Sequence, residues 1–166
     1  MAKKASHKFL CDIMLSNICR WLRILGIDSE MPKEQDDDFI ITYAYKTKRI
    51  LLTKDKELYN KALLHDVNSY LIVGNDKLKI INNLIKDFNL KISFPRRTRC
   101  TVCNGKLITL KKNELANDKL LPQELVNKNI KNMKVYKCTN CNKYYWEGMH
   151  WKNILKFVKN LNLNSD

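Results

Sequence analysis

Aspartates stand where two apolar runs end in the first third of the chain. Asp12 follows Phe-Leu-Cys, and Asp55 comes two residues after Ile-Leu-Leu-Thr. A carboxylate at the edge of a core loses hydration, so it needs a metal ion, an arginine or a helix N-terminus as its partner. Three more aspartates, Asp36, Asp37 and Asp38, stand together where a helix is predicted to begin.

These carboxylates suit two different roles. Acidic groups that repel one another are tolerated in a cluster when they hold a divalent cation, and their hard oxygen ligands favour Mg²⁺ or Mn²⁺. The alternative is that Asp55 and the run of three aspartates cap helices, because side-chain oxygens satisfy the free amides of a first turn. The residues alone leave both interpretations open.

Four cysteines form two Cys-x-x-Cys pairs in the second half. Cys100 and Cys103 make the first pair, Cys138 and Cys141 the second, and 34 residues separate them. The spacing within each pair is typical of a tetrahedral zinc site, whereas the separation implies a long inserted loop at roughly 111–131. Disulfides are the alternative, but the sequence has no secretory context. Four thiolates leave zinc no open position, so we expect a structural ion and seek the chemistry elsewhere.

Aromatic residues follow the second cysteine pair in the segment YYWEGMHW, which also contains His150. The rings of Tyr144, Tyr145 and Trp146 either form the small core that a zinc ribbon needs or partly serve as a surface on which bases stack. We favour the core.

Short apolar runs alternate with amphipathic segments over residues 7–90, and these elements must position the aspartates. The pattern predicts a parallel α/β sheet. In such sheets ligands bind beyond the carboxyl ends of the strands, which places Asp12 and Asp55 near one rim. The predicted strands are 8–11, 49–53 and 69–73, and the predicted helices are 14–25, 36–48, 56–65 and 78–88.

The charge of the chain is uneven. The formal net charge is +14, of which residues 1–95 carry +4 (16 basic, 12 acidic) and residues 96–166 carry +10 (15 basic, 5 acidic). Such an excess indicates a polyanionic partner or a solvated, Lys-rich surface. The sequence has neither an apolar run of bilayer length nor the features of a secretory signal, so we expect a soluble cytoplasmic protein.

Four blocks of sequence together resemble one known family. In chain order they are FLCDIMLSNICRWLRILGID, DDDFIITYAYKTKRILLTKD, RCTVCNGKL and CTNCNKYYWEGMHW. They are similar to the Mut-seven C-terminal ribonuclease domain family, and the resemblance covers residues 8–151. It implies a three-layer PIN-like nuclease domain at 1–95, followed by a zinc-ribbon domain at 96–166 with a long insertion between the knuckles.

The resemblance also implies catalytic residues. The family's metal-binding aspartates correspond to Asp12, Asp37 and Asp55, although the run of three aspartates obscures which member of the run is the ligand. Arg20 and Arg23 match an Arg-Trp-Leu-Arg block and either pair with these carboxylates, contact phosphate or occupy ordinary solvent-exposed positions. The implied reaction is hydrolysis of RNA phosphodiester bonds with Mg²⁺ or Mn²⁺.

The basic ribbon is expected to hold the RNA backbone, with Arg96, Arg97, Arg99 and His150 as candidate contacts. RNA is preferred to DNA on the family resemblance only. The main alternative is a non-catalytic factor that binds RNA, such as ribosomal RNA, or the ribosome, and uses the PIN-like domain as a scaffold. A small-molecule enzyme on this fold is a more distant alternative.

Overall fold

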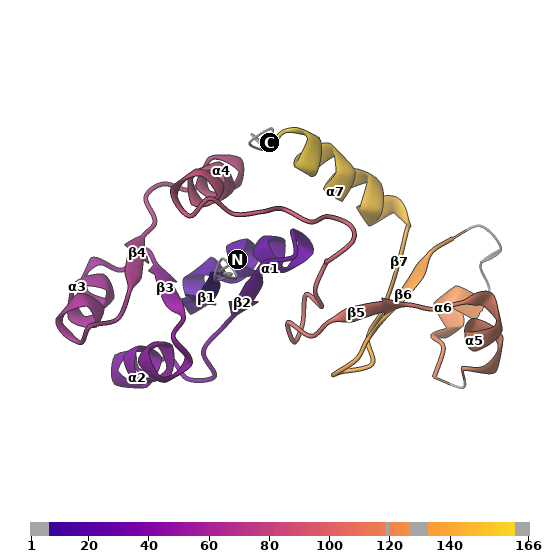
Figure 1. The fold of residues 1–166 in the computed structure, drawn as a ribbon, viewed down its shortest axis with the longest axis horizontal. Helices are drawn as coiled ribbons and strands as arrows, with labels where there is room; N and C mark the ends of the chain where they lie inside the picture. Colours follow the sequence, from indigo (N-terminus) through magenta and orange to yellow (C-terminus); the bar gives the residue numbers. More distant parts are fainter. Residues whose placement is uncertain (1–6, 119, 127–132, 162–166) are drawn as a thin grey trace, which may run out of the picture.

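A sheet of four parallel strands forms the centre of the first half (Figure 1). The structure is a computed structural model that describes residues 7–118, 120–126 and 133–161. The strand order is β2-β1-β3-β4, with β1 beside both β2 and β3. The predicted α/β fold with a parallel sheet is confirmed. The strands are β1 (Lys8–Cys11), β2 (Asp28–Glu30), β3 (Ile50–Thr53) and β4 (Ser69–Leu71).

Helices cover both faces of this sheet and make three layers. Successive strand residues point to opposite faces. Phe9 and Cys11 are therefore buried in a core with α1 and α4, whereas Leu10 is buried with α2 and α3. A 3₁₀ turn (Ile13–Leu15) leads from β1 into α1. The four helices are α1 (Ser16–Ile24), α2 (Asp37–Thr47), α3 (Lys56–Leu64) and α4 (Lys77–Asp87).

The edge strand β2 is absent from the sequence prediction. It has three residues, two of them acidic, so it lacks the apolar run on which the other strands were identified. Its carboxylates are compensated by one buried arginine: Arg49 lies 2.6 Å from Asp28 and also pairs with Glu30. Pairing with β1 and this ion-pair group stabilise a strand that its own composition does not favour.

The second half contains a three-stranded antiparallel sheet in the order β5-β6-β7. Its strands are β5 (Leu107–Thr109), β6 (Val135–Cys138) and β7 (Tyr144–Trp146). Tyr144 is buried and Trp146 packs against its cluster, as the core interpretation predicted for these two rings, whereas Tyr145 is half-buried and outside this cluster. The segment expected to be a loop at 111–131 instead contains α5 (Lys112–Asn117) and α6 (Gln123–Val126), while residues 119 and 127–131 lie outside the described residues. Leu115 and Leu125 from these helices bury against the ribbon.

The last helix, α7 (Met149–Lys159), runs from the ribbon back toward α4 (Figure 1). The C-terminal end of α7 packs on the first half. The ring centres of Phe157 and Trp21 lie 4.0 Å apart, and the ammonium group of Lys77 lies over both rings. Leu161 is buried in the core that α1 and α4 share. Helix packing, as well as the chain itself, thus joins residues 1–95 to residues 96–166. No helix in the described segments has the length and apolar character to cross a membrane.

Candidate functional site

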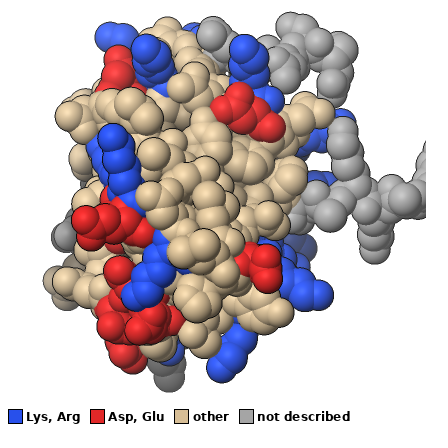
Figure 2. All heavy atoms as spheres, turned by 90° about the vertical axis from the view of Figure 1, so that its left-hand side faces the viewer, with Lys and Arg blue, Asp and Glu red and all other residues tan. Residues whose placement is uncertain are grey.

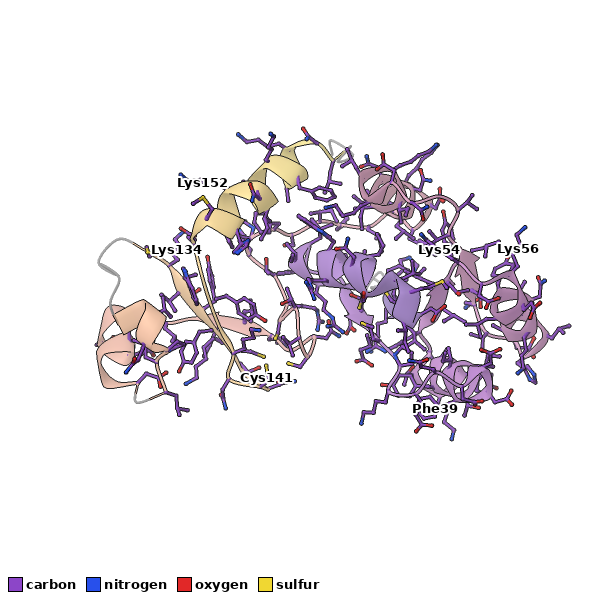
Figure 3. The ribbon with its side chains drawn as sticks, turned by 180° about the vertical axis from the view of Figure 1, so that it is seen from behind. Phe39, Lys54, Lys56, Lys134, Cys141 and Lys152 are labelled. Carbon is purple, nitrogen blue, oxygen red and sulfur yellow. The ribbon has the colours of Figure 1, made fainter. Side chains whose placement is uncertain are left out.

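The four paired cysteines come together at one end of the ribbon. Their sulfur atoms all lie within 4.8 Å of one another, with 3.5 Å between Cys100 and Cys141 and 3.4 Å between Cys103 and Cys138. Four sulfurs at about 2.3 Å from a central Zn²⁺ would be about 3.8 Å apart, so the group is of the right size. Figure 3 shows Cys141 at this end of the ribbon sheet. The donor set suits a structural metal ion such as zinc.

The two knuckles have the same local structure, and each is followed by an asparagine. Asn104 and Asn142 adopt the left-handed conformation (φ 64° and 57°), which asparagine tolerates better than most residues. Their amides donate to the carbonyls of Cys100 and Cys138 at 2.9 and 3.1 Å. Gly105 lets the knuckles approach, because a Cβ there would lie 2.8 Å from the sulfur of Cys138.

Hydrogen bonds favour the thiolate form of one of the four cysteines, Cys100. Burial alone would raise the pKa of Cys100, but hydrogen bonds from Tyr145 and from backbone amides outweigh it and lower the pKa to about 6. The Tyr145 hydroxyl lies 3.0 Å from the Cys100 sulfur and accepts from the amide of Thr101 at 3.1 Å. A low pKa means less cost to form this ligand at neutral pH, whereas burial raises the pKa of Cys103 to about 12.

Asp12 and Asp55 meet through one buried hydroxyl group. The side chain of Thr53, at the end of β3, donates to Oδ2 of Asp12 at 2.8 Å and accepts from the amide of Asp55 at 3.0 Å. The amide of Asp12 donates to the carbonyl of Leu52 at 2.9 Å, which continues the pairing of β1 with β3. Thr53 is fully buried, Asp12 is half-buried and Asp55 is exposed. Adjacent parallel strands therefore bring both aspartates to one rim.

The carboxylates at this rim also serve as helix caps. Oδ1 of Asp55 accepts from the amides of Glu57 and Leu58 at 2.7 and 3.2 Å, so Asp55 caps α3. Oδ2 of Asp55 has no hydrogen-bond partner among the described residues. Oδ1 of Asp12 accepts from the amide of Ile13 at 2.6 Å. Figure 3 labels the two neighbours of Asp55: Lys54, which follows β3, and Lys56, the first residue of α3.

The three consecutive aspartates differ in the partners of their side chains. Asp36 caps α2 by accepting from the amide of Phe39 at 2.9 Å, and Asp38 forms an exposed ion pair with Lys61 at 2.9 Å. The hydrogen bond from Lys61 lowers the pKa of Asp38. Asp37 is half-buried, and its side chain makes no hydrogen bond or ion pair with another described residue. Acidic side chains gather at the lower left of Figure 2, at the height of α2 in Figure 1.

The aspartates of α2 stand apart from the strand-end pair. In the described part of the chain, only the four cysteines form a group of three or more candidate ligands with donor atoms within 4.8 Å. Asp12, Asp37 and Asp55 do not form such a group, although the ion pair between Asp38 and Lys61 places the first turn of α2 beside α3. Thr53 thus links the carboxylate of Asp12 to the backbone amide of Asp55, two of the three predicted residues.

Two of the candidate RNA contacts have structural partners. Arg23 is buried, and its guanidinium donates to the carbonyls of Ser29 at 2.7 Å and Thr101 at 2.8 Å. Arg99 donates to the carbonyl of Asn104 at 2.8 Å and lies 3.3 Å from Asp28. Both arginines therefore fasten the first knuckle to the parallel sheet. Arg20, Arg96, Arg97 and His150 are exposed.

Two parts of this arrangement were missed from the sequence. The sequence shows Thr53 as an ordinary strand residue, and only its position before Lys54 and Asp55 indicates that it borders the rim. Asp28 joins the halves, because its Oδ1 accepts from the side chain of Asn104 at 2.8 Å as well as from Arg49. No sequence pattern predicts that pair, whose members are 76 residues apart.

A family model, the Mut7-C RNAse domain, matches residues 7–158. The match spans both the parallel sheet with its strand-end aspartates and the cysteine group. The chain belongs to the Mut7-C RNAse domain family. Membership indicates a nuclease or another RNA-related function, and the family name points to RNA as the substrate. Comparison with individually curated proteins gives no significant match.

Proposed function

We propose that this Mut7-C protein is a metal-dependent ribonuclease whose reaction takes place at the carboxyl ends of β1 and β3. The single observation that carries the proposal is the Thr53 hydroxyl, which bonds to the Asp12 carboxylate and to the backbone amide of Asp55 at the rim where parallel α/β sheets bind ligands. Family membership supports RNA as the substrate.

Asp12 and Asp55 would hold one or two Mg²⁺ or Mn²⁺ ions, with Asp37 as the third ligand. Their donors are hard carboxylate oxygens, and each oxygen can accept more than one partner, so the existing hydrogen bonds do not exclude a cation. When bound, the cation would supply an activated water and stabilise negative charge on the phosphate. Thr53 keeps the Asp12 carboxylate oriented, and the amides of α3 do the same for Asp55.

The ribbon half would bind the RNA backbone, because it carries most of the positive charge. Residues 96–166 contribute +10 of the total of +14. Arg96 and Arg97 are exposed beside the first knuckle, and Arg20 is exposed on α1. Contacts from such groups are independent of sequence and weaken as salt rises. Arg23 and Arg99 would act on RNA only indirectly, through the position of the knuckle.

The test is RNA cleavage by the zinc-loaded protein with added Mn²⁺ or Mg²⁺. Replacing Asp12 by Asn keeps the shape of the side chain and removes its charge, so cleavage should fall by orders of magnitude while RNA affinity stays nearly unchanged. Asp76→Asn is the matched control, because Asp76 caps α4 by accepting from the amide of Lys79 at 3.0 Å and has no proposed metal role. Separate Asn substitutions of Asp36, Asp37 and Asp38 should identify Asp37 as the third ligand. Equal cleavage by wild type and Asp12→Asn would refute the proposal.

A non-catalytic factor that binds RNA or the ribosome is the second candidate. One observation favours it: Asp36 and Asp55 each cap a helix, so both have a structural role without any cation. The same experiment separates the candidates, because such a factor would bind RNA, leave it intact, and be unaffected by Mn²⁺.

A further inference from the structure

A cavity of about 490 Å³ lies in the second half, where the linker after α4, the ribbon sheet and the start of α7 meet. Its volume is in the range usual for sites that take small organic groups, about 300–1,000 Å³. Aromatic side chains line it from three separate segments: Phe94 from the linker, Tyr136 from β6 and Trp151 from α7, together with the three rings of β7.

The rings fall into two groups with different environments. Tyr144 is part of the ribbon core, with Trp146 packed against it, and the Tyr145 hydroxyl is bonded to the first knuckle. Phe94, Tyr136 and Trp151 are only half-buried. Trp151 contacts both of the other rings, with ring centres 5.0 Å from Phe94 and 6.0 Å from Tyr136, the latter nearly parallel at 16°. These three rings form a partly exposed group outside the ribbon core.

The formally charged side chains of the lining are arginines, and Glu147, outside the lining, accepts a hydrogen bond from the Tyr136 hydroxyl at 3.4 Å. Arg96, Arg99 and His150 are among the lining residues, and the described lining contains neither aspartate nor glutamate. Arg96 and His150 are exposed, whereas Arg99 is held by Asp28 and Asn104. Lys134 and Lys152 lie on the ribbon side of the molecule in Figure 3, away from Lys54 and Lys56 at the carboxylate rim. An anionic ligand with a flat apolar part would match both the rings and the charge.

We propose that this cavity binds an unpaired base of single-stranded RNA, which stacks on Trp151 and Tyr136 while Arg96 and His150 contact the adjoining phosphates. The proposal rests on the RNA-related function proposed above and specifies the form of the substrate. In a duplex each base face is covered by its neighbours, so an aromatic cavity selects single strands, bulges or ends. The site lies apart from the carboxylate rim, so it would hold RNA some nucleotides from the bond that is cleaved.

The first test compares ligands and leaves the protein unchanged. Zinc-loaded wild-type protein, without added Mg²⁺ or Mn²⁺, is titrated into a fluorescent oligoadenylate of about ten nucleotides, an abasic oligomer with the same phosphates, and a duplex of the same length. Stacking of one base should make the oligoadenylate bind roughly tenfold tighter than the abasic oligomer or more, and tighter than the duplex. Equal affinity for the oligoadenylate and the abasic oligomer would overturn the proposal.

The second test changes the aromatic face. Trp151→Leu keeps an apolar side chain but removes the stacking surface, so the preference for the oligoadenylate over the abasic oligomer should disappear. Trp151→Phe keeps a ring and should retain most of the preference. Zinc content and thermal unfolding identify any variant that fails to fold, in which case the wild-type comparison still decides. A folded Trp151→Leu protein with an undiminished preference would contradict the proposal.

The two proposals fail in different ways. Binding that depends on bases without any cleavage under Mn²⁺ would remove the ribonuclease proposal and leave the cavity proposal standing. Cleavage without a preference for the oligoadenylate over the abasic oligomer would remove the cavity proposal and leave the ribonuclease proposal standing.

Discussion

Replacement of Thr53 by Val tests the link between the two strand-end aspartates. Valine has nearly the shape of threonine, so the fully buried site keeps its packing and loses only the hydroxyl. Two hydrogen bonds disappear: the one donated to Oδ2 of Asp12 and the one accepted from the amide of Asp55. A bond to a charged group contributes about 1.5–3 kcal/mol and a neutral one about 1 kcal/mol.

The half-buried carboxylate of Asp12 can recover part of this loss from water. We therefore expect Thr53→Val to lower the free energy of unfolding by about 1–3 kcal/mol. The effect on cleavage should be larger than the loss of folded protein, since a displacement of about 1 Å in a catalytic group can cost roughly 100-fold in rate. Urea unfolding measures the first quantity, and single-turnover RNA cleavage with saturating Mn²⁺ measures the second.

Thr53→Ser is the control, because it keeps the hydroxyl and removes one methyl group. It should lose about 1 kcal/mol of stability through the cavity left behind but retain most of the cleavage rate. The reasoning would be refuted by a folded Thr53→Val protein that cleaves RNA at the wild-type rate, or by equal losses of rate in the two variants.

Three further predictions concern the ribbon and its junction with the sheet. The protein should contain one Zn²⁺ per chain by elemental analysis, and a chelator should unfold the ribbon, as measured by circular dichroism, because so small a core depends on its metal. Burial raises the pKa of Asp28, but hydrogen bonds from Arg49 and Asn104 outweigh it and leave the pKa below its ordinary value. The contribution of Asp28 to the free energy of unfolding is thus complete above about pH 4, and it is lost as the pH falls through the lower pKa of the folded state. The urea midpoints of wild type and Asp28→Asn should therefore converge in acid. Charge reversal of Arg96 and Arg97 together should weaken RNA binding and flatten its dependence on salt without changing the unfolding midpoint.

The sequence predicted the elements that carry their own pattern. The buried strands β1 and β3 consist of apolar runs, and the helices show regular apolar spacing, so their order implied a parallel sheet with Asp12 and Asp55 at one rim. The cysteine pairs predicted a metal site because the two-residue spacing is itself the geometry of a knuckle. In each case the physical cause acts within a few neighbouring residues.

The sequence did not predict features that depend on distant partners. The strand β2 forms because Arg49 compensates Asp28 and Glu30, and no local pattern shows that pairing. In the sequence Arg23 resembles a surface arginine of an amphipathic helix. In the structure it is buried and donates hydrogen bonds to carbonyls of the first knuckle. The aromatic cavity likewise forms only when three separate segments meet.

The most direct measurement of the central claim is the affinity of the zinc-loaded protein for Mn²⁺, followed by electron paramagnetic resonance without RNA. Asp55 and Asp76 both cap helices, so a substitution by Asn at either position changes a cap in the same way. We predict that Asp55→Asn weakens Mn²⁺ binding at least tenfold, corresponding to about 1.4 kcal/mol or more, whereas Asp76→Asn binds as wild type does. Unchanged Mn²⁺ affinity in Asp55→Asn would contradict the account and leave Asp55 as a helix cap.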